Sequence, residues 1–288
     1  MPELPEVESV RLGLDRVVTD RTVRAVQVLH PRPVRAHLAG PDDFRDRLVG
    51  RTFATPGRRG KFLWLPFAGG DALMAHLGMS GQFRVDEPGA PLLRNTRVLI
   101  DLDDGRQLRF VDQRMFGGLS ISPMEPPSAD GPGDEVPLEA AHVARDPFDP
   151  LFDADAVVSR MKRSTSGVKA LLLNQRIVSG FGNIYVDETL WRARLHHLRR
   201  GETLTRKVLH QVLEQGREVM GEALAVGGTS FDALYVNVNG ESGYFARSLH
   251  AYGREHQPCD RCGTPIVREA FANRSSFTCP VCQPRPRR

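Results

Sequence analysis

The sequence predicts an α+β protein whose first domain is a β-sandwich with flanking helices and whose second domain is helical. Short β-branched and aromatic segments, separated by turn residues, fill residues 22–122. Helical periodicity then dominates from about residue 153 onward. All four cysteines fall within the last thirty residues, which indicates a small terminal module. A chain of 288 residues that is 40% hydrophobic is long enough for two cores.

The first expected element is a helix over residues 5–18, after the opening octet MPELPEVE. Apolar residues recur every three or four positions from Val7 to Val17, which gives one apolar stripe. Pro5 suits the first turn, where its missing N–H is no loss, and Pro2 precedes the helix. The simplest interpretation of the three glutamates in the octet is that they complement the helix dipole, and for Glu8 we keep it.

Seven short strands are expected next, with one short helix at residues 42–48. Their number and spacing are typical of a sandwich. The expected strands are residues 21–29, 61–67, 71–77, 81–85, 96–102, 106–111 and 117–122.

An acidic, proline-rich stretch separates the two domains. Residues 122–156 carry nine acids and one arginine, a net charge of −8, and seven of the 21 prolines lie between Pro123 and Pro150. We expect an irregular, partly mobile connector there. Helices are expected at 153–164, 166–176, 183–195 and 205–227. The predicted domains are therefore 1–121, 122–150 (connector), 151–244 (helical) and 245–288 (cysteine module and basic tail).

Charge and hydropathy limit the classes of partner that the chain can be expected to bind. The net charge is +4, so outside the acidic stretch the chain is strongly basic, and residues 254–288 alone carry +4. This pattern favours a polyanion partner such as nucleic acid, with a solvated surface as the equal alternative. No apolar run is long enough for a membrane span, and the N-terminus lacks a secretory signal. We expect a soluble, cytoplasmic, monomeric protein.

The cysteines follow the pattern C-x2-C, sixteen residues, C-x2-C. This spacing is typical of a tetrahedral four-thiolate zinc site, and two disulfides would be the alternative in an oxidising compartment. Four thiolates leave no coordination position for water, so we expect one structural zinc ion. The predicted ligands are Cys259, Cys262, Cys279 and Cys282.

Four turns combine glycine with residues suited to nucleic acid. SGFGN joins two expected helices, where Asn183 either caps the second helix or grips a phosphate. HLGMSG and DQRMFGG are either ordinary β-turns or loops that display apolar wedges. GRRGKFL is either a solvated basic turn or a phosphate clamp.

Together these segments resemble one family closely. The opening octet, RRGKFL, HLGMSG, DQRMFGG, SGFGNIYVDE, YVNVNGESGYF and CDRCGTPI…NRSSFTCPVCQ are similar to segments of the formamidopyrimidine-DNA glycosylases, bifunctional bacterial enzymes that remove oxidised purines. The resemblance runs in order from residue 1 to about 283. It implies a β-sandwich, a helix–two-turn–helix and a zinc-bound β-hairpin, with damaged double-stranded DNA held between the domains of a nucleoid-associated enzyme.

The resemblance also implies catalytic roles. After removal of Met1, the Pro2 nitrogen attacks C1′ of the damaged nucleotide and forms a Schiff base, and Glu3 donates a proton with support from Glu6. Lys61 is implied in β-elimination. Arg274 is implied in δ-elimination and phosphate binding.

Further residues are implied in DNA contact. Those that fill the void left by the damaged base, or grip the backbone, are Met79, Arg114, Phe116, Lys169 and Asn183. The loop YVNVNGESGYF is implied to close over the flipped base. Two positions depart from the usual pattern: Asn95 stands where members often have histidine, and Ser164 where they often have lysine. At both we still expect DNA contact, helped by neighbouring basic residues.

The chemistry is independently reasonable. An α-amino group titrates near ~7.7–8.0 and a lysine near ~10.4, so far more of the terminal amine is neutral at pH 7. A secondary amine gives an iminium that has no proton to lose and remains an electron sink. A proton-donating Glu3 needs a raised pKa, through burial or crowding by Glu6.

Three alternatives remain. An endonuclease VIII-type enzyme for oxidised pyrimidines usually has glycine where this chain has Leu4, and it lacks a loop like YVNVNGESGYF. A non-catalytic zinc-finger DNA-binding protein would have no need of Pro2 and Glu3. A zinc-ribbon RNA-binding protein would leave the opening octet unexplained.

Overall fold

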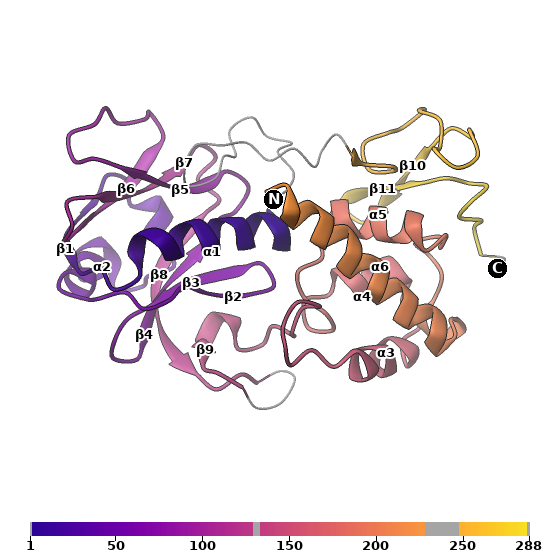
Figure 1. Ribbon diagram of the computed structural model, residues 1–288, viewed down its shortest axis with the longest axis horizontal. Helices are drawn as coiled ribbons and strands as arrows, with labels where there is room; N and C mark the ends of the chain where they lie inside the picture. The colour runs from indigo at the N-terminus through magenta and orange to yellow at the C-terminus, as the bar shows by residue number, and fades with distance from the viewer. Residues whose placement is uncertain (1, 129–132, 228–247, 287–288) are drawn as a thin grey trace. The chain divides into compact units, whose positions relative to one another are not determined.

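The computed structural model describes residues 2–128, 133–227 and 248–286. The chain forms two compact units (Figure 1). The first changes to the second between His142 and Val143; the described residues 226–227 belong to the first unit, and 248–286 belong to the second. The division after His142 lies inside the predicted connector. The predicted boundary at residues 244 and 245 lies outside the described residues, as does the loop YVNVNGESGYF. None of the described helices is long and apolar enough to cross a membrane.

The first unit begins with helix α1 (Leu4–Val18), which confirms the expected opening helix. A 3-10 turn, η1 (Arg32–Val34), and helix α2 (Gly40–Leu48) follow the first strand. One face of α1 is buried, and Val7, Val10 and Leu14 are at most 1% exposed. The three- and four-residue spacing in the sequence is therefore the spacing of the face that packs.

Two antiparallel sheets account for most of the remaining described residues of the first unit. The four-stranded sheet has the order β1 (Val23–Val28), β6 (Thr96–Leu102), β7 (Gln107–Asp112), β5 (Gly81–Asp86). The five-stranded sheet has the order β2 (Gly57–Arg59), β3 (Phe62–Pro66), β4 (Asp71–His76), β8 (Gly118–Glu125), β9 (Val136–Pro137). All seven expected strands are present. The short edge strands β2 and β9 were not expected.

One hydrophobic core joins both sheets and both helices. Phe110 on β7 and Leu63 on β3 belong to it together with Leu14 on α1 and Phe44 on α2, and all four are at most 1% exposed. Two sheets that bury their inner faces in one core form a sandwich. The core fixes the strand ends from which the site loops leave.

The expectation of an irregular connector was wrong for part of residues 122–150. β9 pairs with the end of β8, with Met124 opposite Pro137, and η2 (Leu138–Ala140) follows it. Val136 and Ala140 are at most 2% exposed in a small apolar cluster. Proline is tolerated because β9 is an edge strand, whose outward N–H needs no partner.

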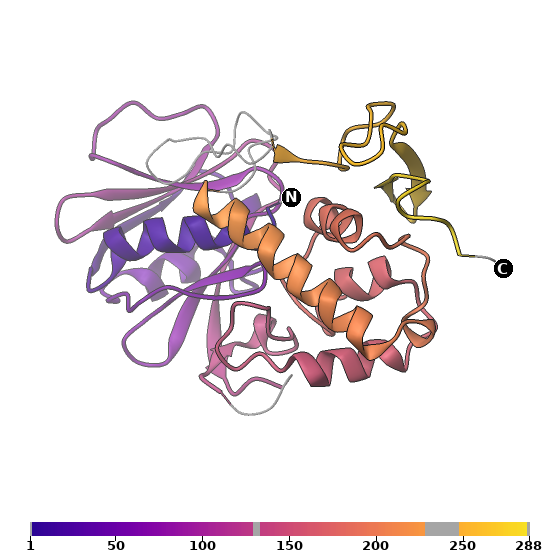
Figure 2. The same cartoon turned by 45° about the vertical axis from the view of Figure 1, so that its right-hand side comes forward.

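The described residues of the second unit form the four helices that were expected (Figure 2). They are α3 (Ala154–Lys162), α4 (Val168–Leu173), α5 (Asn183–Arg192) and α6 (Arg206–Ala225), with a 3-10 turn, η3 (Gly201–Thr203), before α6. Helix α6 closely approaches the turn before α5 at Gly216, where an added Cβ would lie 2.5 Å from the ring of Phe181, the residue before the α5 N-cap. A side chain at this position would displace that ring.

A two-stranded hairpin, β10 (Val267–Phe271) and β11 (Arg274–Thr278), completes the second unit. Its register places Phe271 opposite Arg274 at the turn and Val267 opposite Thr278. A small cluster that includes Ala251, Ile266 and Phe277 packs this hairpin against Trp191 of α5. The hairpin and the helices therefore share contacts within one unit.

Candidate functional site

The opening segment is fixed by a reciprocal pair of hydrogen bonds. Glu3 is the N-cap of α1. Its side chain accepts from the backbone of Glu6, while the Glu3 N–H donates to Glu6 Oε2 at 2.9 Å. Both side chains are 3% exposed, and Pro2, directly before this cap, is buried. This capping box, which the spacing in MPELPEVE could have revealed, holds the chain end in one place.

The turn that carries Lys61 is tied to the same helix. Glu8 on α1 accepts from Arg58 Nε at 2.8 Å, and Arg58 Nη1 donates to the Gly60 carbonyl at 2.9 Å. Burial raises the pKa of Glu8, but the hydrogen bonds and charges of Arg11 and Arg58 outweigh it and leave this pKa below its usual value. Dipole complementation alone is therefore an incomplete account of Glu8. Its ion pair fixes the β2–β3 turn beside α1.

The two loops with wedge-like residues, residues 76–81 and 112–118, lie together. Ser80 Oγ donates to Asp112 Oδ1 at 2.6 Å and accepts from the Arg114 N–H at 2.9 Å. Met79 is 38% exposed and Phe116 is 46% exposed, so neither is a core side chain. The core alternative is wrong for these two residues.

Asn95 lies beside the 112–118 loop, which it contacts through Asp112 and Arg97. Its carbonyl accepts from the Asp112 N–H at 2.9 Å, and its side chain accepts from Arg97 Nη2 at 3.2 Å. Arg97 Nε in turn donates to the Asp112 carbonyl at 2.9 Å. The residue that departs from the usual family pattern therefore sits beside an arginine and the 112–118 loop.

Lys169 does not lie on the surface. It is 0% exposed, its Nζ lies 2.6 Å from Asp187 Oδ1, and it donates to the Ser275 carbonyl at 3.1 Å. Burial raises the pKa of Asp187 to about 6, against the opposing effect of Lys169. The prediction of a direct DNA contact by Lys169 is not supported, because its ammonium is enclosed by protein acceptors. The pair instead joins α4 and α5 to β11.

Asn183 is placed differently from the capping prediction. Gly182 is the N-cap of α5 and Asn183 is its first residue, so a cap by Asn183 was wrong. Its side-chain amide donates to the Ser275 carbonyl at 2.9 Å. Arg274, one residue earlier, is exposed at the start of β11. Asn183 therefore supports the strand that presents Arg274.

Ser164 closes a turn after α3. Its hydroxyl accepts from the Ser166 N–H at 3.2 Å, and its carbonyl accepts from the Glu202 N–H at 2.9 Å. The side chain is only half-buried, so a surface contact stays open to it.

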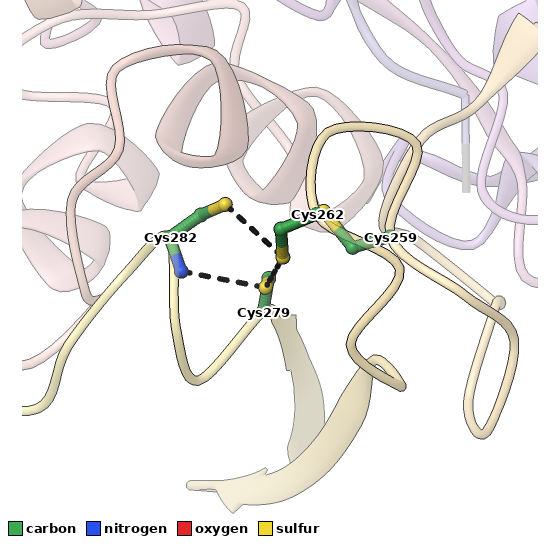
Figure 3. Close-up of side chains that lie close together, drawn as sticks. All are labelled: Cys259, Cys262, Cys279 and Cys282. Atoms are coloured by element: carbon green, nitrogen blue, oxygen red, sulfur yellow. Dashed lines mark hydrogen bonds between the residues drawn. The ribbon is translucent and has the colours of Figure 1, made fainter.

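The four cysteines meet as the spacing predicts (Figure 3). Their sulfur atoms all lie within 4.8 Å of one another, and Cys262 Sγ is 3.5 Å from that of Cys279 and 3.6 Å from that of Cys282. A disulfide would need about 2.05 Å. Tetrahedral zinc with Zn–S distances near 2.3 Å places its sulfurs roughly 3.8 Å apart, so the four thiolates fit this ion. They hold one structural zinc.

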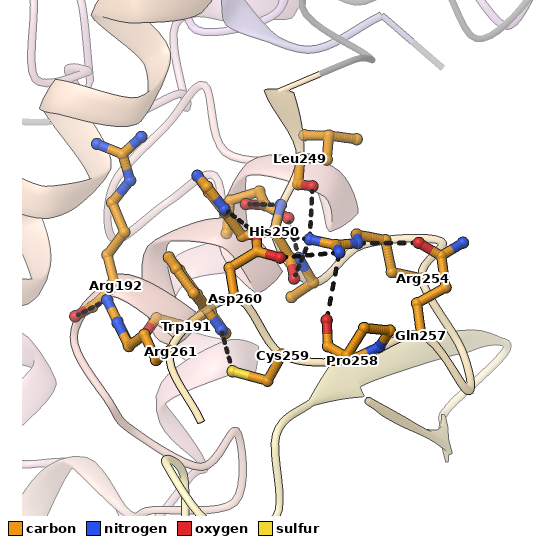
Figure 4. A network of polar contacts seen from close by, with 12 residues as sticks. Trp191, Arg192, Leu249, His250, Arg254, Gln257, Pro258, Cys259, Asp260 and Arg261 are labelled. Atoms are coloured by element: carbon orange, nitrogen blue, oxygen red, sulfur yellow. Dashed lines mark hydrogen bonds and ion pairs between the residues drawn. The ribbon is translucent and has the colours of Figure 1, made fainter. Parts of the chain in front are cut away.

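Helix α5 supports the cysteine module with Trp191, which Figure 4 shows beside Cys259, and with Glu188. Trp191 Nε1 donates to Cys259 Sγ at 3.4 Å, while its ring stacks between His250, 4.4 Å from its centroid, and the Arg261 guanidinium at 3.7 Å. Glu188 accepts from three consecutive backbone N–H groups, of His250, Ala251 and Tyr252, at 2.8–2.9 Å. N–H donors to ligand sulfur and fixed flanking loops orient the ligands of a metal site.

A second cluster in this unit joins His196, His197 and Glu269. His196 Nδ1 accepts from the Leu198 N–H at 3.2 Å, so the neutral ring carries its proton on Nε2. That atom lies 3.1 Å from Glu269 Oε2. His197 Nδ1 lies 3.6 Å from the same oxygen, so the three side chains form one polar cluster beside β10.

Comparisons with known proteins decide the family. A model of the formamidopyrimidine-DNA glycosylase N-terminal domain matches residues 1–119, that of its H2TH domain residues 143–234, and that of the zinc finger found in FPG and IleRS residues 257–285. The formamidopyrimidine-DNA glycosylase of a Nocardioides species is 60% identical over 100% of this chain and 96% of its own length. That of Salinispora arenicola is 56% identical over 100% and 98%. This chain belongs to the formamidopyrimidine-DNA glycosylase family.

Solved members of the family have the same fold. A complex between a Lactococcus lactis FPG mutant and a Fapy-dG containing DNA matches 99% of this chain and 100% of its own, with 28% identity and a TM-score of 0.85. A complex of Lactococcus lactis Fpg with an abasic site containing DNA matches equally widely, with a TM-score of 0.84. The chain is a DNA glycosylase of base excision repair.

Several supporting residues of this family member were missed from the sequence. Asp112 and Ser80 lie inside the motifs DQRMFGG and HLGMSG, yet they were given no role. Asp187 and Glu188 are the acidic pair of SGFGNIYVDE. A signal was available, because an acidic pair on an otherwise apolar helix face has to find buried partners.

Proposed function

We propose that this glycosylase removes oxidised purines, 8-oxoguanine and formamidopyrimidines, from duplex DNA and then cuts the backbone as an AP lyase. The observation that carries the proposal is the fixed opening segment, with Pro2 directly before the Glu3–Glu6 capping box. A chain end has no structural need for this anchoring. The substrate class is supported by the solved Lactococcus lactis relatives, which are complexes with Fapy-dG containing DNA and with abasic site containing DNA.

The proposed reaction starts at the Pro2 nitrogen, once Met1 is removed. The neutral amine forms a bond to C1′, the glycosidic bond breaks, and the base leaves with a proton. Opening of the sugar ring needs a proton on O4′, and Glu3 supplies it. The iminium that results accepts electrons in β-elimination, which breaks the C3′–O bond, and in δ-elimination, which breaks the C5′–O bond.

Glu3 is placed to act as the proton donor, because it directly follows Pro2 and is only 3% exposed. Glu6, equally buried, accepts from the Glu3 N–H and so keeps the segment in register. Glu6 therefore positions Glu3 and takes no part in the proton transfer.

The remaining roles are divided between the two units. In the first unit, Lys61 assists β-elimination, Met79, Arg114 and Phe116 fill the space left by the base, and Asn95 with Arg97 contacts the backbone. In the second unit, Arg274 assists δ-elimination, and Asn183 and Ser164 contact phosphates. Lys169 supports β11 from inside and is not a contact residue in this proposal. One copy of the chain acts on the DNA, and its cytoplasmic location on the bacterial nucleoid follows from that substrate.

Borohydride trapping tests the proposal. Mature protein with a free Pro2 amine should give a covalent adduct with an 8-oxoguanine duplex, and a form with one extra residue ahead of Pro2 should lose on the order of 10³-fold or more in rate, because its nitrogen is an amide. Pro5→Ala is the matched control, since Pro5 only begins the helix. An absence of adduct with the mature protein would refute the enzyme mechanism. Faster removal of thymine glycol than of 8-oxoguanine would refute the substrate.

A further inference from the structure

We propose that Asp112 and Ser80 are positioning residues that hold Met79, Arg114 and Phe116 as a single preformed wedge. The inference rests on the proposed function, since it assigns these three side chains to the void in the duplex. It adds that the two loops act as one rigid body before DNA is bound. Neither Asp112 nor Ser80 is itself placed against DNA.

Asp112 uses both carboxylate oxygens to lock the loops. Oδ1 accepts from Ser80 Oγ at 2.6 Å and Oδ2 accepts from the Gly117 N–H at 2.8 Å. The side chain is 0% exposed. Ser80 Oγ also accepts from the Arg114 N–H at 2.9 Å, so this hydroxyl connects the 76–81 loop to the residue that carries the wedge guanidinium. A buried carboxylate needs such donors, and removing one leaves an uncompensated charge.

Direct packing leaves no room for the loops to slide. Gly78 has φ +61°, and an added Cβ would lie 2.5 Å from the Gly117 nitrogen and 2.6 Å from the Phe116 carbonyl carbon. The backbone of the 76–81 loop therefore touches the backbone of the 112–118 loop at the base of Met79 and Phe116. Movement of one loop has to carry the other.

The outer side of the 112–118 loop is held by the η1 segment. Arg35 donates to the carbonyls of Gly117 at 2.8 Å and Phe116 at 3.2 Å, and Arg32 donates to that of Met115 at 3.3 Å. Met115 itself has φ +53°, a conformation that a side-chain-bearing residue adopts only when its surroundings enforce it. Between these arginines and Asp112, the loop backbone is restrained from two sides.

The restrained loops display side chains that the fold itself does not need. Met79 and Phe116 are 38% and 46% exposed, and the Arg114 guanidinium lies 5.4 Å from the centre of the Phe116 ring. Apolar wedges inserted between bases offset the cost of unstacking. A wedge whose backbone is ordered beforehand loses less conformational entropy on insertion. Asp112 and Ser80 therefore favour base extrusion and leave the later chemistry unchanged.

Ser80→Ala is the test, with Ser122→Ala as its control, since both hydroxyls are buried in the same unit at 2% and 1% exposure. In single-turnover assays on an 8-oxoguanine duplex, we expect Ser80→Ala to slow base excision roughly tenfold, because two hydrogen bonds are lost. A 2-aminopurine beside the lesion should show a slower rise in fluorescence. Cutting of a single-stranded abasic oligonucleotide, which has no stack to enter, should be unchanged.

Two results would overturn the inference: equal slowing on both substrates, or a Ser80→Ala rate equal to that of Ser122→Ala. If Ser80→Ala does not fold, Arg35→Ala tests the same restraint, with Arg24→Ala as its control, because both arginines are exposed. We again expect slower base excision from the duplex and unchanged cutting of the single-stranded abasic oligonucleotide. Failure of the proposed function is recognised separately, because the wild-type protein would then excise no base and form no borohydride adduct.

Discussion

Two segments of the chain are anchored by opposite means. Helix α1, which carries Pro2 and Glu3 at its start, is held by apolar burial, with Val7, Val10 and Leu14 packed into the core that both sheets share. The zinc module, residues 248–286, has only a small apolar cluster around Ile266 and Phe277. Its anchors are four thiolates and the side chains of α5.

The difference follows from size. A helix that packs on a large core is stabilised sufficiently by apolar burial, so its polar side chains are not needed as anchors and can order its first turn. A module of about forty residues cannot enclose such a core, so metal binding and hydrogen bonds to charged groups supply its stability. The two segments should therefore fail under different perturbations.

Removal of a zinc ligand should have the largest effect. We expect Cys279→Ser to release zinc and unfold the module, because structural zinc contributes on the order of 10 kcal/mol to such folds. DNA affinity should fall at least tenfold, roughly the loss of one or two charged contacts. The release of zinc is measured by metal analysis, and the loss of affinity by titration with DNA. The two tryptophans separate the units, since Trp191 touches the module and Trp64 lies in the sandwich. Unfolding reported by Trp64 would contradict the proposed independence.

Loss of the Glu188 charge should have a smaller effect on the same module. Glu188→Gln replaces a carboxylate that accepts three backbone N–H groups with an amide that can satisfy only two of them at its oxygen. We expect a loss of about 2–4 kcal/mol, measured by urea unfolding followed at Trp191. The control is Glu222→Gln, whose exposed pair with Arg192 should contribute less than about 1 kcal/mol. Equal effects would show that α5 does not anchor the module through Glu188.

Much of the fold could be predicted because its elements have strong local signals. Apolar periodicity marked α1 and α6, β-branched and aromatic segments between turn residues marked the seven longer strands, and the cysteine spacing marked the metal. The edge strand β9 was missed because its stability comes from pairing with β8 and not from its proline-rich sequence. Local patterns carry little information on such pairings.

The same distinction between local signals and distant contacts applies to the candidate site. The cysteines could be chosen because the two C-x2-C pairs have the spacing of a zinc site, whereas the roles of Pro2 and Glu3 came from the family resemblance of the opening octet. Lys169 was misjudged because its partners, Asp187 and Ser275, lie 18 and 106 residues away. Burial of a charged side chain is decided by such distant partners.

The pH dependence of the C-terminal unit should show the smallest effect. Burial, with the charges of His196 and Lys169, lowers the pKa of His197 to about 3. Because the unfolded chain binds this proton below about pH 6.5, the stability contributed by neutral His197 is complete above that pH and is lost progressively toward pH 3. Between pH 7.5 and 5.5 the loss should be about 1.4 kcal/mol.

His197→Gln should remove this part of the pH dependence, and His256→Gln, at an 88% exposed side chain, should not. The pH dependence of the variant's stability has to be subtracted from that of the wild type, because burial and the Arg35 charge also lower the pKa of His76 in the sandwich. Urea unfolding of the zinc-loaded protein, followed at Trp191 in a Trp64→Phe background, measures the difference. If the two histidine variants keep the same slope, His197 is protonated equally in the folded and unfolded chain, and its stacking on His196 at 4.3 Å does not require a neutral ring.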